Sequence, residues 1–122
     1  MWTAEQLRAI NEDGNLLVSA AAGAGKTAVM TERIARIIAS GTDVSEILVV
    51  TFTNPAAAEM KQRIERRLSE LAESTDDTKL KMHLHDSAIN ISTANISTIH
   101  SFCGNVLRRN CHIVGLDPAF RT

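Results

Sequence analysis

One run of eight residues constrains the fold of this chain more than any other: Ala20-Ala21-Ala22-Gly23-Ala24-Gly25-Lys26-Thr27. It stands between the apolar segment 16–18, which predicts a buried strand, and the segment 25–40, whose apolar residues recur at helical spacing. Small residues let the backbone fold tightly around an anion, and backbone N–H groups at a helix start can then cradle phosphates. A strand, such a loop and a helix in this order are the context of a phosphate-binding loop, and they predict an α/β fold.

The side chains at the end of this run suit a nucleoside triphosphate and its metal ion. Lys26 stands where it can reach the β- and γ-phosphates as a point charge, and the Thr27 hydroxyl stands where it can ligate Mg²⁺. We therefore expect Lys26 and Thr27 to be catalytic and residues 20–27 to bind the nucleotide. Ala20 occupies the place of the first glycine of the usual pattern. The alternative is a strand–helix turn, rich in glycine and alanine, that binds nothing.

The composition agrees with one ordinary globular domain. The chain has 122 residues, of which 44% are apolar and 22% charged, and its formal net charge is −1. These values exclude a disordered tail, a collagen-like repeat and a coiled coil. Near-neutrality argues against a wholly basic nucleic-acid binder but allows a local basic groove. The N-terminus lacks the pattern of a secretory signal, and no apolar stretch is long enough to span a bilayer. Cys103 and Cys111 are expected to be buried, reduced thiols, so we expect a cytoplasmic protein without membrane contact.

Local signals predict the remaining helices and strands. Thr3 and Gln6 have the spacing of a capping box at the start of a helix over residues 3–12. Asn54 is expected to cap another helix with Pro55 at its first position, and its apolar face would be Met60, Ile64, Leu68 and Leu71. The other expected elements are a buried strand at 47–52, a loop at 73–77, a helix at 79–89, a strand at 95–99, a helix from 100 or 101 to about 110, and a turn at 115–118.

Aromatic and polar side chains follow two of the predicted strands. Phe52, Thr53 and Asn54 come at the end of the strand at 47–52, and Thr98 and His100 come at the end of the strand at 95–99. Ligand sites in α/β sheets gather at the carboxyl ends of the strands, so we expect these residues and the loop to share one edge. Each also has a plainer interpretation: Phe52 as core, Asn54 as a helix cap, and His100 as a capping or core residue.

These segments, together with the loop, carry a family resemblance. Residues 51–60 read Thr-Phe-Thr-Asn-Pro-Ala-Ala-Ala-Glu-Met, and residues 98–102 read Thr-Ile-His-Ser-Phe. With the loop, they resemble motifs of superfamily 1 helicases of the UvrD/Rep type, in which alanine is common at the position of Ala20. Within that family, residues 96–103 and 116–121 are most similar to the A subunits of bacterial ATP-dependent helicase/nucleases (AddA type). The resemblance covers essentially the whole chain.

The resemblance implies a fold and a set of site residues. Residues 1–122 would be the N-terminal part of the first RecA-like motor domain, a partial P-loop domain with a short parallel sheet flanked by helices. ATP and Mg²⁺ would be the cofactors, and Gln6 would read the adenine, although the capping box competes for that side chain. Single-stranded DNA would be contacted where an aromatic face lies beside hydrogen-bonding groups, at Phe52, Thr53, Asn54, Thr98 and His100. Many relatives have lysine at the position of Pro55, so one possible phosphate contact is missing here.

The resemblance also implies a motor that translocates on single-stranded DNA and processes double-strand break ends for recombinational repair. Its partners would be DNA ends and a second helicase/nuclease subunit of the B type. Such a motor needs a Walker B Asp-Glu pair and arginines from a second motor domain. This chain has no apolar strand that ends in Asp-Glu, and Asp76-Asp77 follows no strand, so we expect the chain alone to be inactive. Two other classes stay open: a stand-alone P-loop protein, such as a small kinase or GTPase, and a nucleotide- or DNA-binding module without turnover.

Two surface features lead to further expectations. Basic residues cluster on the helix after Asn54 and at the end of the last helix: Lys61, Arg63, Arg66, Arg67, Arg108 and Arg109. They predict a phosphate track, or, for the first cluster, a solvated helix face paired with Glu59 and Glu65. The strand at 16–19 is expected to lie inside a larger sheet, so its open edge should let the isolated chain self-associate.

Overall fold

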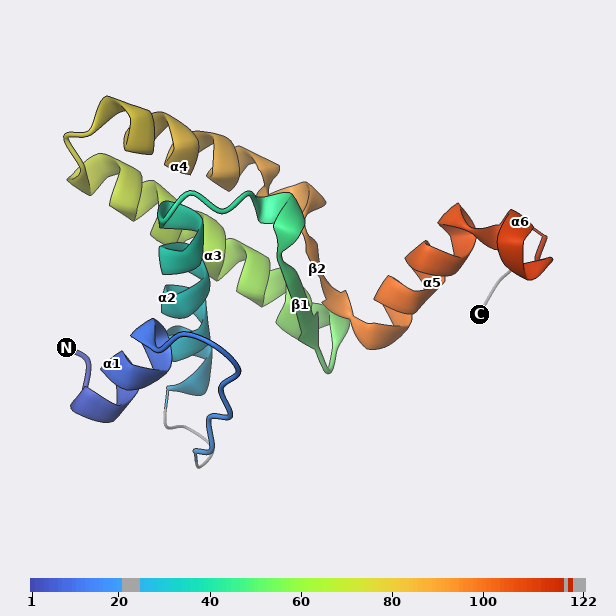
Figure 1. Cartoon of the computed structure of the whole chain (residues 1–122), viewed down its shortest axis with the longest axis horizontal. Helices are drawn as coiled ribbons and strands as arrows, with labels where there is room; N and C mark the ends of the chain where they lie inside the picture. The colour runs from blue at the N-terminus through green and yellow to red at the C-terminus, as the bar shows by residue number, and fades with distance from the viewer. Residues whose placement is uncertain (21–24, 118, 120–122) are drawn as a thin grey trace.

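The described part of the chain consists of helices and one small parallel sheet, with long helices packed on one face of the sheet (Figure 1). The structure, a computed structural model, describes residues 1–20, 25–117 and 119. In chain order the elements are α1 (Ala4–Asn11), α2 (Lys26–Ala39), the 3-10 helix η1 (Val44–Glu46), β1 (Leu48–Thr51), α3 (Asn54–Ser74), α4 (Thr78–Asn90), the 3-10 helix η2 (Ile91–Thr93), β2 (Asn95–Thr98), α5 (Ile99–Arg109) and α6 (Cys111–Val114). The predicted class, α/β with a short parallel sheet flanked by helices, is confirmed.

The capping box of α1 forms as predicted. The Thr3 N–H donates to Gln6 Oε1 at 2.9 Å, and the Gln6 N–H donates to Thr3 Oγ1 at 3.1 Å. Two backbone N–H groups that have no partner inside the helix are thereby satisfied. The box fixes the start of α1 and the orientation of the Gln6 side chain.

The start of α3 differs by one residue from the prediction. Thr53, and not Asn54, is the N-cap, because Thr53 has an extended backbone and its Oγ1 accepts from the Ala56 N–H at 3.2 Å. Pro55 lies in the first turn, where its missing N–H removes no intrahelical hydrogen bond. The helix also continues to Ser74, so the predicted loop at 73–77 is shorter than expected, and Asp77 caps α4.

The two strands pair in parallel, with Thr51 opposite Thr98 at their carboxyl ends. Val49 packs against the core, but Leu48 and Val50 are exposed. The prediction of a buried strand at 47–52 is therefore only half right, because the described helices cover one face of this sheet and not the other.

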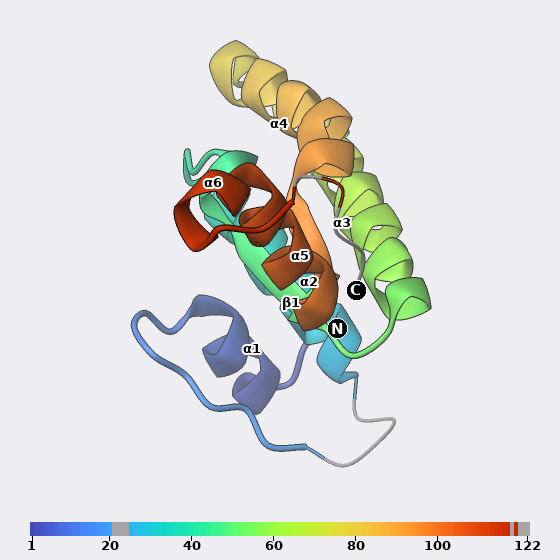
Figure 2. The same cartoon turned by 90° about the vertical axis from the view of Figure 1, so that its right-hand side faces the viewer.

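The main core lies between α2, α3, α4 and β2. The long helices α3 and α4 lie side by side and run antiparallel in both views (Figures 1 and 2), joined by a short loop. The largest fully buried side chains come from three of these helices: Ile38, Ile64, Leu68 and Leu84. The predicted apolar face of α3 is confirmed, with Met60, Ile64 and Leu68 buried and Leu71 partly buried.

The predicted buried strand at 16–18 is wrong for the described structure. Leu16, Leu17 and Val18 belong to no strand, and all three are exposed. An extended segment gains hydrogen bonds and burial only beside a neighbouring strand. The sheet of the described residues consists of β1 and β2 alone, so the segment has no neighbour and stays in solvent.

A second, smaller cluster attaches α1 to α2. Ala9, Ile10 and Val29 form it, and Trp2 packs against it. Arg33 Nη1, on α2, donates to the carbonyl oxygens of Ala9, Ile10 and Glu12 at 2.9, 3.4 and 2.8 Å. One arginine thus satisfies carbonyl groups that the end of a helix leaves open.

The last two helices project from the rest of the molecule (Figure 1). The short helix α6 was not predicted; it ends at Gly115, whose φ of 72° begins the predicted turn. Cys111 is buried as expected, but Cys103 is exposed. The expectation for Cys103 is wrong because the described helices leave that side of α5 open to solvent.

Candidate nucleotide and DNA site

The start of α2 has the backbone that a phosphate-binding loop requires at its end. Gly25 is the N-cap with φ 77°, in the left-handed region that residues with a Cβ seldom adopt. Lys26 and Thr27 follow as the first helical residues, and both are exposed. The predicted ligand residues Ala21, Ala22, Gly23 and Ala24 lie outside the described residues.

A cavity of about 290 Å³ lies between α1 and the start of α2. Both Gln6 and Lys26 line it, so the structure brings together two predicted site residues that are 20 positions apart. The full lining is Thr3, Glu5, Gln6, Ala9, Val18, Ser19, Ala20, Lys26 and Val29. The lining residues that the sequence did not predict are Thr3, Glu5, Ala9, Val18, Ser19 and Val29; their closeness to Gln6 or to residues 20–27 was the available signal.

The two roles expected to compete for Gln6 use different atoms of its amide. Oε1 accepts the capping hydrogen bond from the Thr3 N–H. Nε2 lies beside Gly25, because a Cβ built on that glycine would be 3.5 Å from it. Among the described residues nothing accepts a hydrogen bond from Nε2. Gln6 therefore caps α1 and still presents a donor to the cavity.

The residues predicted after the strands meet at one edge of the sheet, since β1 and β2 end side by side. Phe52 is fully exposed, so its interpretation as core is wrong. Asn54 and His100 are exposed as well. Thr98 caps α5: its Oγ1 accepts from the Ser101 N–H at 3.2 Å and donates to Ser101 Oγ at 2.9 Å. The edge thus offers one free aromatic ring among hydroxyl, amide and imidazole groups.

The nucleotide segment and the strand ends face the same end of the molecule. In both views α2 begins at the end where β1 and β2 finish (Figures 1 and 2). Lys26 and Thr27 are therefore on the same side as the cluster of Phe52, Thr53 and His100. The start of α2 and the strand ends thus lie at the same end of the molecule, whereas the strand expected before the loop does not form among the described residues.

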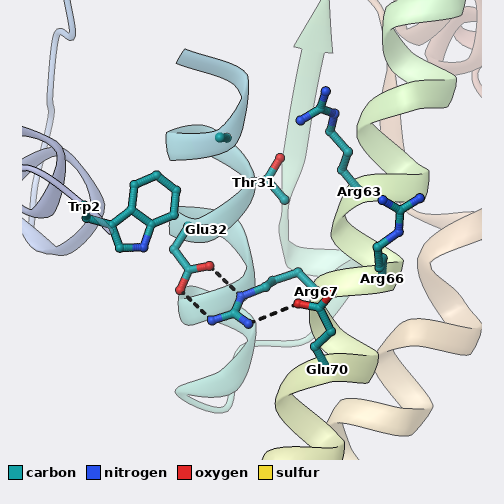
Figure 3. A pocket seen from close by; sticks show the side chains of 8 residues that line it. Trp2, Thr31, Glu32, Arg63, Arg66, Arg67 and Glu70 are labelled. Carbon is teal, nitrogen blue, oxygen red and sulfur yellow. Dashed lines mark hydrogen bonds and ion pairs between the residues drawn. The ribbon is translucent and has the colours of Figure 1, made fainter. Parts of the chain in front are cut away.

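Basic residues on α3 are used within the fold. Arg63 pairs with Glu59 at 2.8 Å, and Lys61 Nζ donates to the Ser92 carbonyl at 3.2 Å. Arg67 reaches across to α2, where it contacts both carboxylate oxygens of Glu32, at 2.6 and 3.2 Å (Figure 3). Most of this cluster thus favours internal pairing over a phosphate track.

Glu32 is the most buried charged group among the described residues, with its side chain 5% exposed. Arg67, and then Arg36 at 2.9 Å, hold its pKa below the ordinary value, against burial, which raises it. The pKa of Arg67 is raised in turn, chiefly by its hydrogen bond to Glu32. Glu32, Arg67 and Trp2 are among the residues that line a cavity of about 340 Å³ between α2 and α3 (Figure 3). Their chemistry is that of a closed ion-pair network that joins the two helices.

No helix in the described part of the chain is both long and apolar enough to cross a membrane.

These features define a class of protein. A left-handed glycine followed by lysine and threonine opens a helix of an α/β fold, and Gln6 lines a cavity beside it. The glycine, lysine and threonine at a helix start are how a phosphate-binding loop ends in proteins of the P-loop class. Residues 2–122 match the UvrD/REP helicase N-terminal domain, and the chain belongs to the UvrD/REP helicase family. The resemblance inferred from residues 51–60 and 98–102 is thereby confirmed.

Similar proteins narrow the comparison within that family. The chain is 48% identical over 120 residues to the A subunit of the ATP-dependent helicase/nuclease of Lactobacillus gasseri. It is 48% identical over 124 residues to the protein of that name from Clostridium botulinum, and 49% identical over 122 residues to the one from Heliobacterium modesticaldum. Each match covers 98% of this chain but only 8–10% of the relative. The chain therefore corresponds to a small part of these proteins.

Proposed function

We propose that residues 1–122 are the N-terminal part of the first RecA-like motor domain of an ATP-dependent DNA helicase/nuclease. In this proposal the segment binds ATP with Mg²⁺ and contacts single-stranded DNA. The observation that carries it is the fully exposed Phe52 at the strand ends, on the side of the molecule where Lys26 opens α2. An exposed large aromatic ring among polar groups suits stacking on a base.

The nucleotide residues have distinct roles in this proposal. Residues 20–27 cradle the phosphates, Lys26 neutralises the charge of the β- and γ-phosphates, and the Thr27 hydroxyl ligates Mg²⁺. Gln6 Nε2 donates to a ring nitrogen of the adenine while Oε1 keeps α1 capped. The cavity of about 290 Å³ that Gln6 and Lys26 share supports this assignment.

The DNA residues act without reading sequence. Phe52 stacks on a base, and Thr53, Asn54, Thr98 and His100 hydrogen bond to phosphate and sugar. Since these groups lie at the same end of the molecule as the start of α2, a change at the nucleotide would be passed to the strand contacts through the fold between them. That coupling would drive translocation along the strand.

The activity of the whole protein follows from the same proposal. It would hydrolyse ATP, process double-strand break ends for recombinational repair with a second subunit of the B type, and work in the cytoplasm. Residues 1–122 alone would be inactive, because they contain no strand that ends in an Asp-Glu pair.

A single-turnover ATPase assay, with and without single-stranded DNA, tests the proposal on this chain and on the longer protein that carries it. We expect hydrolysis stimulated by DNA in the longer protein only. Lys26→Ala should abolish it, whereas the control Lys79→Ala, an exposed lysine on α4, should not. Full ATP-driven unwinding by the Lys26→Ala protein would refute the nucleotide assignment.

The DNA assignment has its own test. Phe52→Ala combined with His100→Ala should lower the DNA stimulation of the ATPase and leave basal hydrolysis largely unchanged. Met82→Ala is the matched control, because Met82 is also an exposed apolar residue but lies on α4, on the other side of the molecule from the strand ends (Figure 1). Unchanged stimulation in the double variant would refute DNA contact. Turnover by the isolated chain would favour a stand-alone P-loop enzyme, and DNA binding without turnover in the longer protein would favour a binding module.

A further inference from the structure

Thr31 is a buried polar residue of α2 that has no role in the function proposed above. Its side chain lies on the side of α2 that faces α3 (Figure 3). Its Oγ1 donates to the Thr27 carbonyl, one turn earlier on α2, at 2.8 Å, and lies 3.7 Å from Met60 Sδ on α3. A hydroxyl has one proton, and the short distance assigns it to the carbonyl, so Met60 is contacted mainly by packing. Thr31 thus touches the first turn of α2 and the second turn of α3.

Both helices begin at residues of the proposed site. Lys26 and Thr27, proposed to hold the phosphates and Mg²⁺, open α2. Thr53 caps α3 and Asn54 opens it, and both are proposed to contact DNA. The two starts lie at the same end of the molecule (Figures 1 and 2). At about 1.5 Å per residue, the contact between Thr31 and Met60 is about 6 Å along α2 from Thr27 and about 9 Å along α3 from Asn54.

The two helices are also joined below this contact. Ile34 of α2 and Ile64 of α3 belong to the same core. Glu32, the residue after Thr31, accepts a hydrogen bond from Arg67 on α3 at 2.6 Å. A closely packed interior deforms little and transmits strain. A displacement of the first turn of α2 would therefore be passed on to α3.

We propose that Thr31 is a positioning residue that couples the bound nucleotide to the DNA contacts. Its hydroxyl holds the turn that carries Thr27, and its packing on Met60 passes a displacement of that turn to the start of α3. This role rests on the ATP and DNA contacts proposed above and concerns their regulation. ATP would change the affinity for single-stranded DNA, and DNA would change the affinity for ATP by the same factor.

Fluorescence anisotropy of labelled oligothymidine measures this coupling in the longer protein that carries residues 1–122. The measured quantity is the ratio of the dissociation constants for DNA without and with a non-hydrolysable ATP analogue and Mg²⁺. Thr31→Val replaces the hydroxyl with a methyl group of similar size and has a similar helix propensity, so the variant should fold. We expect it to bring the ratio about two- to tenfold closer to one. Thr31→Ser keeps the hydroxyl and should keep the wild-type ratio.

Ser69→Ala is the matched control. Ser69 Oγ donates to the Glu65 carbonyl at 3.0 Å, so this variant also removes a hydroxyl that bonds to the carbonyl four residues earlier. Its hydrogen bond stays within α3, about 14 Å along the helix from Met60, and the ratio should not change. Met60→Ala removes the other side of the contact. It should also bring the ratio closer to one, and adding Thr31→Val to it should have little further effect.

Thermal unfolding of the same variants separates coupling from stability. A lower Tm with an unchanged ratio in Thr31→Val would show a merely structural residue and overturn the positioning role. Equal losses of coupling in Thr31→Val and Ser69→Ala, or a loss in Thr31→Ser as large as in Thr31→Val, would overturn it too. If the wild-type protein binds both ligands with a ratio of one, the positioning role fails and both binding assignments stand. If the wild-type protein fails to bind the nucleotide or the DNA, the proposed function fails and the positioning role fails with it.

Discussion

The ion pair between Glu32 and Arg67 allows the effect of burial on a salt bridge to be measured within one helix. Arg67→Ala leaves Glu32, which is 5% exposed, with Arg36 as its remaining partner. The control is Arg63→Ala, four residues earlier on α3, which breaks the ion pair of Arg63 with Glu59. In that pair the arginine side chain is 44% exposed and the glutamate side chain 57%. Both variants remove one arginine, and Arg67→Ala also removes a second, exposed pair with Glu70 at 3.2 Å. Because an exposed pair contributes little, the variants differ mainly in the burial of the Glu32 carboxylate.

The structure sets the expected magnitudes. Removing one partner of a buried pair costs about 3–5 kcal/mol. Arg36 keeps its hydrogen bond to Glu32, and the Arg67 side chain is 34% exposed. Both facts reduce the loss of free energy of unfolding to below the lower end of this range. We expect a loss of about 2 kcal/mol, which for a domain of this size lowers Tm by about 6–10 °C. The exposed pair contributes at most about 0.5 kcal/mol, or about 2 °C.

Thermal unfolding followed by circular dichroism measures both variants, and pH supplies an independent check. The pKa of Glu32 is lowered in the fold from 4.5, so its contribution is present above that pH and is lost as the pH falls through the lowered pKa. The difference between wild type and Arg67→Ala should therefore narrow below pH 4.5. Equal losses of Tm in Arg67→Ala and Arg63→Ala at pH 7, or a difference independent of pH, would refute the reasoning.

Three further predictions follow from the fold. Leu68→Ala should lower the free energy of unfolding, measured in urea, by about 2–5 kcal/mol, because it leaves a cavity in the main core. Leu17→Ala is the control: the Leu17 side chain is in solvent, so the change should be less than about 0.5 kcal/mol. Similar values for the two variants would refute the assigned burial. Thr98→Ala should lower the free energy of unfolding by about 1 kcal/mol, because α5 loses its cap, and Thr98→Ser should keep the wild-type value. The midpoint of urea unfolding measures both changes. The isolated chain should self-associate through its exposed apolar segment and sheet face, and Leu17→Lys with Val50→Lys should reduce this; a constant monomer mass by light scattering over a wide concentration range would contradict it.

Local features of the structure were predictable from the sequence. The capping box of Thr3 and Gln6, the helix start at Lys26 and the buried face of α3 each depend on residues a few positions apart. Such patterns can be recognised in the sequence because capping and helical spacing involve only residues within one or two turns of a helix. The choice between Thr53 and Asn54 as the cap of α3 was not decidable in this way, since both side chains can accept the hydrogen bond.

Features that depend on distant partners were less predictable. The apolar segment 16–18 has the composition of a strand, but a strand exists only where another strand pairs with it. The exposure of Phe52 and the burial of Glu32 likewise depend on which helices cover which face.

The attachment of α1 has a consequence for its local stability. Only the small cluster around Ile10 and Val29, the hydrogen bonds from Arg33 and one from Arg36 to Asn11 hold α1 to α2 within the described part of the chain, whereas α3 and α4 share the main core. Segments with few buried contacts open without global unfolding, so the amide hydrogens of α1 should exchange with solvent well before those of α3. Gln6 is part of α1, so this wall of the cavity between α1 and the start of α2 opens when α1 opens. A molecule that fills the space between α1 and α2 would slow this opening in proportion to its affinity, and exchange at α1 would report its binding even where α3 and α4 are unaffected.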